Sequence, residues 1–195
     1  MDDDEILEIG EDTNKLVPST SNARYRPVSG DNSVPRPLQV ERRIAFLGHC
    51  SVGKSSIIAQ FIDDHFPENY DPTIATTYTK NFHFRGRSFI LHLADTAGQD
   101  EFSLEVSGCP VDVHAYILVY AINCRRSFQV VQYIYSKIID TLGVANFPLT
   151  LVANKMDLPV KERKVSSEEG RRLAEKWNTF SCPNEWQCLQ LELVS

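Results

Sequence analysis

Residues 48–55 have the sequence GHCSVGKS, the pattern G-x-x-x-x-G-K-S of a phosphate-binding loop. Such a loop lies between a strand and a helix. The apolar run RIAFL at residues 43–47 predicts the strand, and SIIAQFIDDHF, starting at Ser56, predicts the helix. In this setting backbone N–H groups and the helix N-terminus face phosphate oxygens. The stretch therefore predicts a site for a nucleoside triphosphate in an α/β fold.

The residues of this loop have different expected roles. Lys54 adds a positive charge near the β- and γ-phosphates and is a candidate catalytic residue, and the hydroxyl of Ser55 is a candidate Mg²⁺ ligand. The positions predicted to contact the nucleotide here are Gly48, Ser51, Val52, Gly53, Lys54, Ser55 and Ser56.

A second motif, Asn154-Lys155-Met156-Asp157, follows an apolar strand predicted at residues 148–153. A carboxylate at Asp157 can accept hydrogen bonds from N1–H and N2–H of guanine, and adenine lacks that donor pair. Taken alone, the four residues could also be a solvated turn. Asn154, Lys155 and Asp157 are therefore candidate guanine-binding residues.

Two further motifs lie between these: YDPTI at residues 70–74 and DTAGQ at residues 95–99. Each could be an ordinary turn or strand exit. The second follows the carboxyl end of a predicted strand, where ligands of open α/β sheets bind. Four motifs in this order favour a guanine-nucleotide site over four unrelated turns.

The rest of the chain alternates strand and helix patterns, as expected for a mostly parallel sheet. Apolar residues three and four apart predict a helix at 127–142, ended by Gly143, and Ser166 with Glu169 forms a capping box for the next helix. Further strands are predicted at 77–84, 88–95 and 113–121. Composition divides the chain into an acidic, proline-containing disordered tail (1–40), a globular domain (41–180) and a C-terminal segment (181–195).

Bulk composition excludes several classes of protein. A net charge of −6 over 195 residues argues against a nucleic-acid partner, because such proteins need a basic face. The five cysteines have no C-x-x-C spacing, which favours a reducing compartment, and no apolar run approaches the length of a membrane span. We expect a cytoplasmic monomer.

The motifs and their spacing resemble the Ras superfamily, and its Rheb branch in particular, over about residues 41–180. The resemblance implies a P-loop NTPase G domain with a mostly parallel six-stranded sheet flanked by helices. It implies a small GTPase that binds GTP or GDP with Mg²⁺. It also assigns roles by position: Thr73 to Mg²⁺ and the γ-phosphate, Asp95 to the metal through water, Gly98 to the γ-phosphate, Gln99 to the attacking water, Tyr70 to nucleotide binding, and Phe66 and Lys155 to the two faces of guanine.

The same resemblance implies partners. Segments 68–78 and 96–110 would change conformation with the γ-phosphate. Effector proteins would bind through Tyr70–Tyr78 and 96–110, a GTPase-activating protein and an exchange factor would regulate the cycle, and the output would reach a TOR-type kinase complex.

The sequence departs from the family in two places. Cys50 occupies the position of a Ras glycine beside the γ-phosphate, where a side chain would slow hydrolysis; a redox-sensitive thiol there is a second interpretation. At the C-terminus no sixth strand, guanine-contacting loop, final helix or C-a-a-X ending is recognisable. The alternating Leu189, Leu191 and Leu193 could form a substitute strand, or the segment could be unrelated sequence.

These departures leave other hypotheses. A non-cycling nucleotide-binding module would fit Cys50 and the altered end, and we expect a domain lacking its final helix to be less stable and to bind nucleotide more weakly. An ATP-dependent nucleotide kinase would share the phosphate loop. Asn154 and Asp157 disfavour the kinase.

Overall fold

The computed structural model describes residues 39–64, 75–98, 110–144 and 146–182, all within the compact unit Pro37–Ser195. Six strands form one sheet in the order β2-β3-β1-β4-β5-β6. Among the described strands, β2 pairs with β3 antiparallel, and the other four neighbouring pairs are parallel. The strands are β1 (Val40–Leu47), β2 (Thr76–Phe84), β3 (Arg87–Asp95), β4 (Ala115–Ala121), β5 (Leu149–Asn154) and β6 (Phe180–Cys182). The helices are α1 (Lys54–Asp63), α3 (Arg125–Leu142), η1, a 3₁₀ turn (Val160–Glu162), and α4 (Ser167–Lys176).

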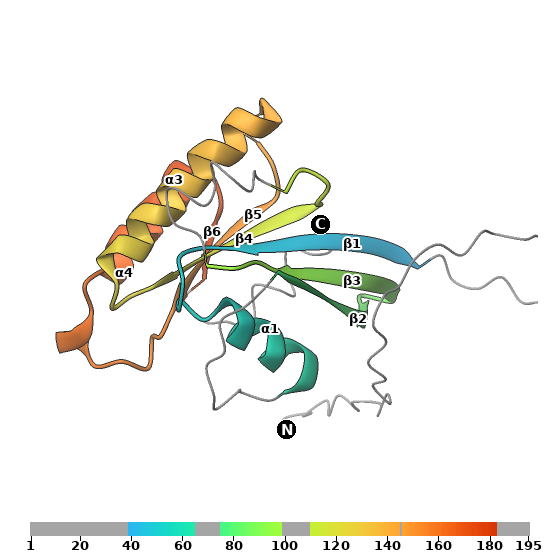
Figure 1. Cartoon of the computed structure of the whole chain (residues 1–195), viewed down its shortest axis with the longest axis horizontal. Helices are drawn as coiled ribbons and strands as arrows, with labels where there is room; N and C mark the ends of the chain where they lie inside the picture. The colour runs from blue at the N-terminus through green and yellow to red at the C-terminus, as the bar shows by residue number, and fades with distance from the viewer. Residues whose placement is uncertain (1–38, 65–74, 99–109, 145, 183–195) are drawn as a thin grey trace, which may run out of the picture. The chain divides into compact units, whose positions relative to one another are not determined.

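Helices cover both faces of the sheet. Figure 1 shows α1 on one side and α3 with α4 on the other. Alternate residues of β1 point to opposite faces, so Ile44 and Phe46 pack with α1, whereas Ala45 and Leu47 pack with α3 and α4. Strands β4 and β5 are buried along their whole length, as expected for central parallel strands. The predicted α/β class and mostly parallel sheet are confirmed.

The predicted helix signals also hold. The N–H of Gly143, at φ 67°, donates to Ile139 O at 2.8 Å and ends α3. Ser166 and Glu169 form the capping box that begins α4. Helix α1 is shorter than the expected segment, because Asp64 adopts a left-handed conformation (φ 50°) and ends it. In the described part of the chain, no helix has the length and apolarity of a membrane span.

A sixth strand is present, although no pattern in the C-terminal sequence made it recognisable, and the six-stranded sheet that the resemblance implied is confirmed. Strand β6 pairs with β5, Phe180 opposite Thr150 and Cys182 opposite Val152. Thr179 holds the approach to this strand, its N–H donating to Ala174 O at 3.0 Å and its hydroxyl to Leu149 O. Three residues are too few to show an alternating pattern, so this pairing left no sequence signal. The candidate substitute strand at 189–193 lies outside the described residues.

Candidate functional site

The phosphate-binding loop connects β1 to α1 and requires glycine at two positions. A Cβ atom at Gly48 would lie 2.2 Å from Val119 O, and one at Gly53 would lie 2.2 Å from Asn154 Nδ2. Gly53 is the N-cap of α1, with φ 99° and no side-chain cap hydrogen bond. The uncapped first turn has backbone N–H groups available to an anion.

Lys54 is the first residue of α1 and is only 6% exposed. Its ammonium group donates to Gly48 O at 3.0 Å and His49 O at 3.1 Å, which places the charge under the loop. Burial lowers the pKa of Lys54 to about 8, against the opposing effect of the nearby Asp95 and Cys50. An additional negative group would favour the charged form, and a phosphate is such a group.

Asp95, at the end of β3, is a buried acid without a full set of partners. It is 1% exposed, and among the described residues neither of its carboxylate oxygens has a hydrogen-bond partner. Burial raises its pKa, although the Ser55 hydroxyl and Lys54 lie close enough to act in the opposite direction. A buried carboxylate in this state is stabilised by a cation. Asp95 and Ser55 together therefore fit the chemistry of an Mg²⁺ site.

The segment after β3 lies against the phosphate loop. A Cβ atom at Gly98 would lie 2.3 Å from Cys50 Cα, and the Thr96 hydroxyl donates to Phe46 O at 2.7 Å. Cys50 is an exposed free thiol with its Sγ 3.2 Å from His49 Nδ1. Thr96 was not among the predicted site residues, because a threonine after a strand carries no distinctive signal. Its bond to β1 orients the chain toward Gly98.

The loop after β5 is connected directly to the phosphate loop. Asn154 is 7% exposed, and its amide nitrogen donates to Val52 O at 2.8 Å, which uses the space that Gly53 leaves free. The Asn154 side-chain oxygen accepts from Lys155 N at 2.5 Å, and Lys155 has a left-handed conformation (φ 68°). Asp157 is exposed. Asn154 thus holds two loops together, while Asp157 remains accessible.

The structure thus brings most described candidates to one edge of the sheet, at the carboxyl ends of β1, β3 and β5. Ser51 has a left-handed conformation (φ 57°), Val52 is buried, and Ser56 lies in the first turn of α1. The candidates outside the described residues are Phe66, Tyr70, Thr73 and Gln99.

Comparison with known proteins gives one consistent family. The Ras family model matches residues 43–182. The chain is 48% identical over 137 residues to the GTP-binding protein Rheb homolog of Drosophila melanogaster, covering 70% of this chain and 75% of that protein. It is 46% identical over 142 residues to GTP-binding protein Rheb of Homo sapiens, with 73% and 77% covered. It is 42% identical over 151 residues to GTP-binding protein rhb1 of Schizosaccharomyces pombe, with 77% and 76% covered.

The matched region contains every described element of the site, from the phosphate loop to Asp157. The chain therefore belongs to the Ras family and is a Rheb-like small GTPase that binds GTP or GDP and hydrolyses GTP.

Proposed function

We propose that the nucleotide phosphates bind the loop Gly48–Ser55 and that guanine binds at Asn154–Asp157. The bond from the Asn154 amide to Val52 O carries this proposal, because it fixes the two loops relative to each other. The exposed Asp157 would accept two hydrogen bonds from guanine. Lys155 would cover one face of the base, and Phe66 the other by family resemblance.

We further propose that Mg²⁺ binds at Ser55, Thr73 and Asp95. The buried, incompletely paired carboxylate of Asp95 supports the assignment. Bound Mg²⁺ would supply positive charge to the β- and γ-phosphates. Only Ser55 and Asp95 are described, and Thr73 enters by resemblance alone.

In this proposal, hydrolysis depends on where the protein holds its groups around the phosphates and on the positive charge that these groups supply. Lys54 stays near the phosphates because two carbonyls hold its ammonium group, and the uncapped start of α1 presents N–H groups. Gln99 would orient the attacking water, and Gly98 would donate its N–H to the γ-phosphate. With Cys50 close to Gly98, we expect intrinsic turnover on the order of 10⁻⁴ s⁻¹ or slower.

The family acts through effector and regulator proteins. For this chain we propose that effectors bind through Tyr70–Tyr78 and 96–110, that a GTPase-activating protein and an exchange factor control the cycle, and that the output reaches a TOR-type kinase complex. The free thiols of Cys50 and Cys124 support a cytoplasmic location, since reducing compartments keep thiols free. No observation in the comparisons favours the non-cycling alternative.

The nucleotide that copurifies with the protein tests the base assignment. Purified protein is heated, and the released nucleotide is separated by ion-exchange chromatography. We expect GDP or GTP in an amount close to that of the protein. Adenine nucleotide would contradict the role of Asp157, and release of no nucleotide would contradict the preformed site.

A further inference from the structure

The guanidinium group of Arg163, which follows η1, makes two hydrogen bonds to the loop that carries Asp157. Its Nη2 donates to Met156 O at 2.9 Å, and its Nε donates to Leu158 O at 3.1 Å. These two carbonyls belong to the residues immediately before and after Asp157. A planar guanidinium group with two donors in a fixed geometry restrains both at once.

The backbone beside Arg163 is itself anchored. The N–H groups of Lys164 and Val165 donate to Ile122 O at 2.8 and 3.0 Å, and the N–H of Ile122 donates to Asn154 O at 3.1 Å. The arginine therefore acts from a segment that is tied, through the end of β4, to the start of the same loop. Ile122 therefore anchors both the start of the loop, at Asn154, and the segment next to Arg163.

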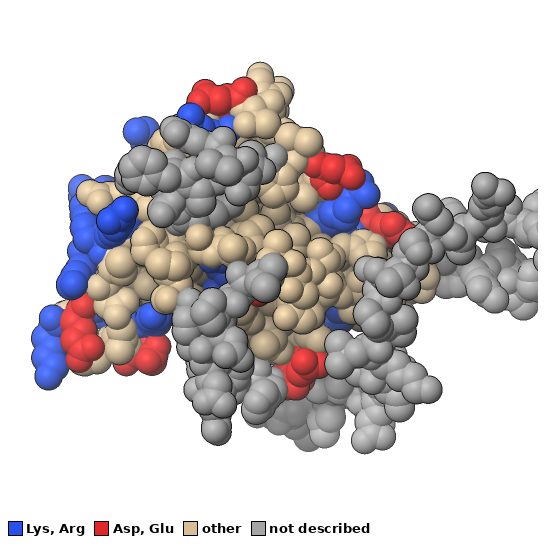
Figure 2. Space-filling model, viewed as in Figure 1, with Lys and Arg blue, Asp and Glu red and all other residues tan. Residues whose placement is uncertain are grey.

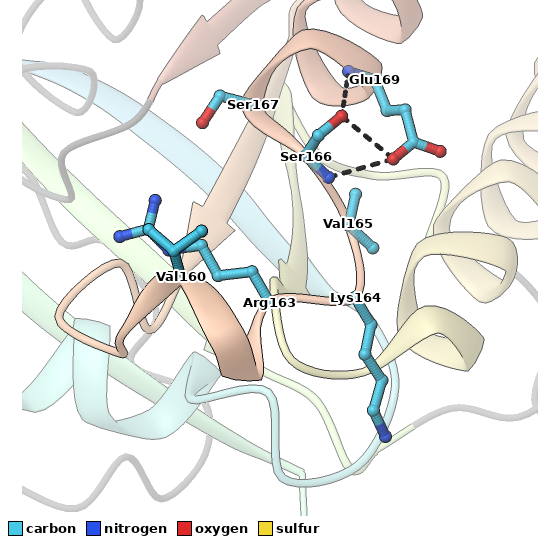
Figure 3. A pocket seen from close by; sticks show the side chains of 7 residues that line it. All are labelled: Val160, Arg163, Lys164, Val165, Ser166, Ser167 and Glu169. Carbon is cyan, nitrogen blue, oxygen red and sulfur yellow. Dashed lines mark hydrogen bonds between the residues drawn. The ribbon is translucent and has the colours of Figure 1, made fainter.

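Other cations nearby have different partners. Figure 2 shows Lys and Arg side chains on the side of the molecule where α3, α4 and the η1 turn lie. Arg171 and Arg172 of α4 pair with the exposed Glu168. Val160, Arg163 and Lys164 all line one pocket, and in Figure 3 the side chains of Arg163 and Lys164 extend in different directions. Arg163 is thus distinguished by its contacts with the backbone of the Asp157 loop.

The Asp157 carboxylate needs such support. Within the described ranges no side chain or backbone group hydrogen-bonds to it, and the carboxylate is exposed. Its direction therefore depends on the backbone between residues 156 and 158. A carboxylate that must accept two hydrogen bonds from one base edge requires this backbone to be fixed before binding.

We infer that Arg163 is a positioning residue for guanine recognition, which holds the Asp157 loop in the conformation that accepts both N1–H and N2–H. The inference rests on the proposed function of Asp157. Loss of the two bonds lets the loop move, which weakens the hydrogen bond to the 2-amino group and speeds release of the nucleotide.

The test compares GDP with inosine diphosphate, which lacks the 2-amino group. Dissociation constants of both are measured by displacement of a fluorescent GDP analogue from the full chain, for wild type, Arg163→Gln, Arg163→Lys and Lys164→Gln. Lys164→Gln is the matched control, because it removes the same charge one residue away from a side chain that bonds to no described group.

We expect Arg163→Gln to weaken GDP binding about tenfold and to reduce the GDP-to-inosine-diphosphate preference severalfold. Arg163→Lys should recover part of both, since lysine can donate to one carbonyl at a time, and Lys164→Gln should match wild type. Equal weakening of both nucleotides in both Arg163 variants, with the preference unchanged, would overturn the inference and indicate a general structural role. A wild-type protein without preference would instead overturn the guanine assignment on which the inference depends.

Discussion

The two ends of the nucleotide site are built on opposite principles. At the phosphate end the charged groups are buried: Lys54 is 6% exposed and Asp95 is 1% exposed. Burial lowers the pKa of Lys54 and raises the pKa of Asp95, and both shifts favour the neutral form of the side chain. At the base end Asp157 is exposed, and the backbone around it is held by Asn154 and Arg163. The buried charged groups need a ligand of opposite charge to offset the cost of their burial, whereas the exposed carboxylate needs only to be held in the right direction.

This difference predicts unequal consequences of mutation. Changes at the phosphate end alter charge balance inside the protein, so they should affect stability and affinity together. Changes at the base end should affect affinity and the choice of base, with little effect on the fold. The phosphate end and the base end of the site are in contact at Gly53, because a residue without a side chain leaves room there for the Asn154 amide.

The largest effect is expected from Gly53→Ala. The new Cβ would collide with Asn154 Nδ2, 2.2 Å away, and φ 99° is unfavourable for alanine. Strain of about 1–2 kcal/mol and an unsatisfied buried group at about 1–3 kcal/mol should lower Tm by roughly 5–15 °C. Nucleotide affinity should fall at least about a hundredfold.

The control for this substitution is Gly86→Ala in the β2–β3 turn. Gly86 also has a positive φ (74°), but a Cβ there meets nothing within 4 Å. Calorimetry and nucleotide titration should show a small loss of stability and normal binding. Equal effects of the two substitutions would mean that contact between the loops is unimportant.

A slightly smaller effect is expected when the proposed metal site is removed. Chelation with EDTA should speed GDP release from wild type at least about tenfold, because charge-assisted contacts of about 1.5–3 kcal/mol are lost. Asp95→Asn should release GDP rapidly with or without EDTA. Asp112→Asn, which removes an exposed acid paired with Arg43, should behave as wild type. An EDTA response preserved in Asp95→Asn would exclude Asp95 from the site.

The buried lysine predicts a pH dependence in the nucleotide-free protein. The pKa of Lys54 is about 8 in the fold and 10.5 when exposed, so between these values the unfolded chain binds more protons. Stability should therefore rise with pH across this window, by about 3 kcal/mol at most. Urea unfolding of wild type and Lys54→Met at pH 7.5 and 10 isolates this contribution. Parallel pH profiles for the two proteins would show that burial does not lower the pKa of Lys54 in the folded protein.

The smallest effect is expected at Cys50, whose backbone already packs against Gly98. Cys50→Gly should relieve crowding near the γ-phosphate and speed single-turnover GTP hydrolysis by about twofold to fivefold, equivalent to about 0.5–1 kcal/mol. Cys50→Ser keeps the bulk and should remain slow. If hydrolysis by Cys50→Gly is unchanged or slower, the side chain at this position does not hinder turnover.

Local signals in the sequence were sufficient for much of this architecture. The phosphate loop, the capping box at Ser166 and the helix end at Gly143 each depend on a few adjacent residues, and the structure confirms the two helix signals. Such features are readable because the physical cause lies within a short segment.

Features that depend on distant partners were not predictable. Strand β6 exists because the free edge of β5 accepts Phe180–Cys182, and three residues carry no periodicity. Arg163 resembles any charged residue of a surface turn until its donors are found beside Met156 O and Leu158 O. Both are properties of the folded chain rather than of one segment.

The division between the two ends is tested most directly by the base preference of Asp157→Asn. An amide at this position presents a donor as well as an acceptor, which complements the carbonyl that xanthine carries in place of the guanine 2-amino group. Dissociation constants for GDP and xanthosine diphosphate, measured with melting temperatures, decide the matter. We predict at least a tenfold loss of GDP affinity, a shift of preference toward xanthosine diphosphate and an unchanged fold. Unchanged GDP binding by Asp157→Asn would contradict the account.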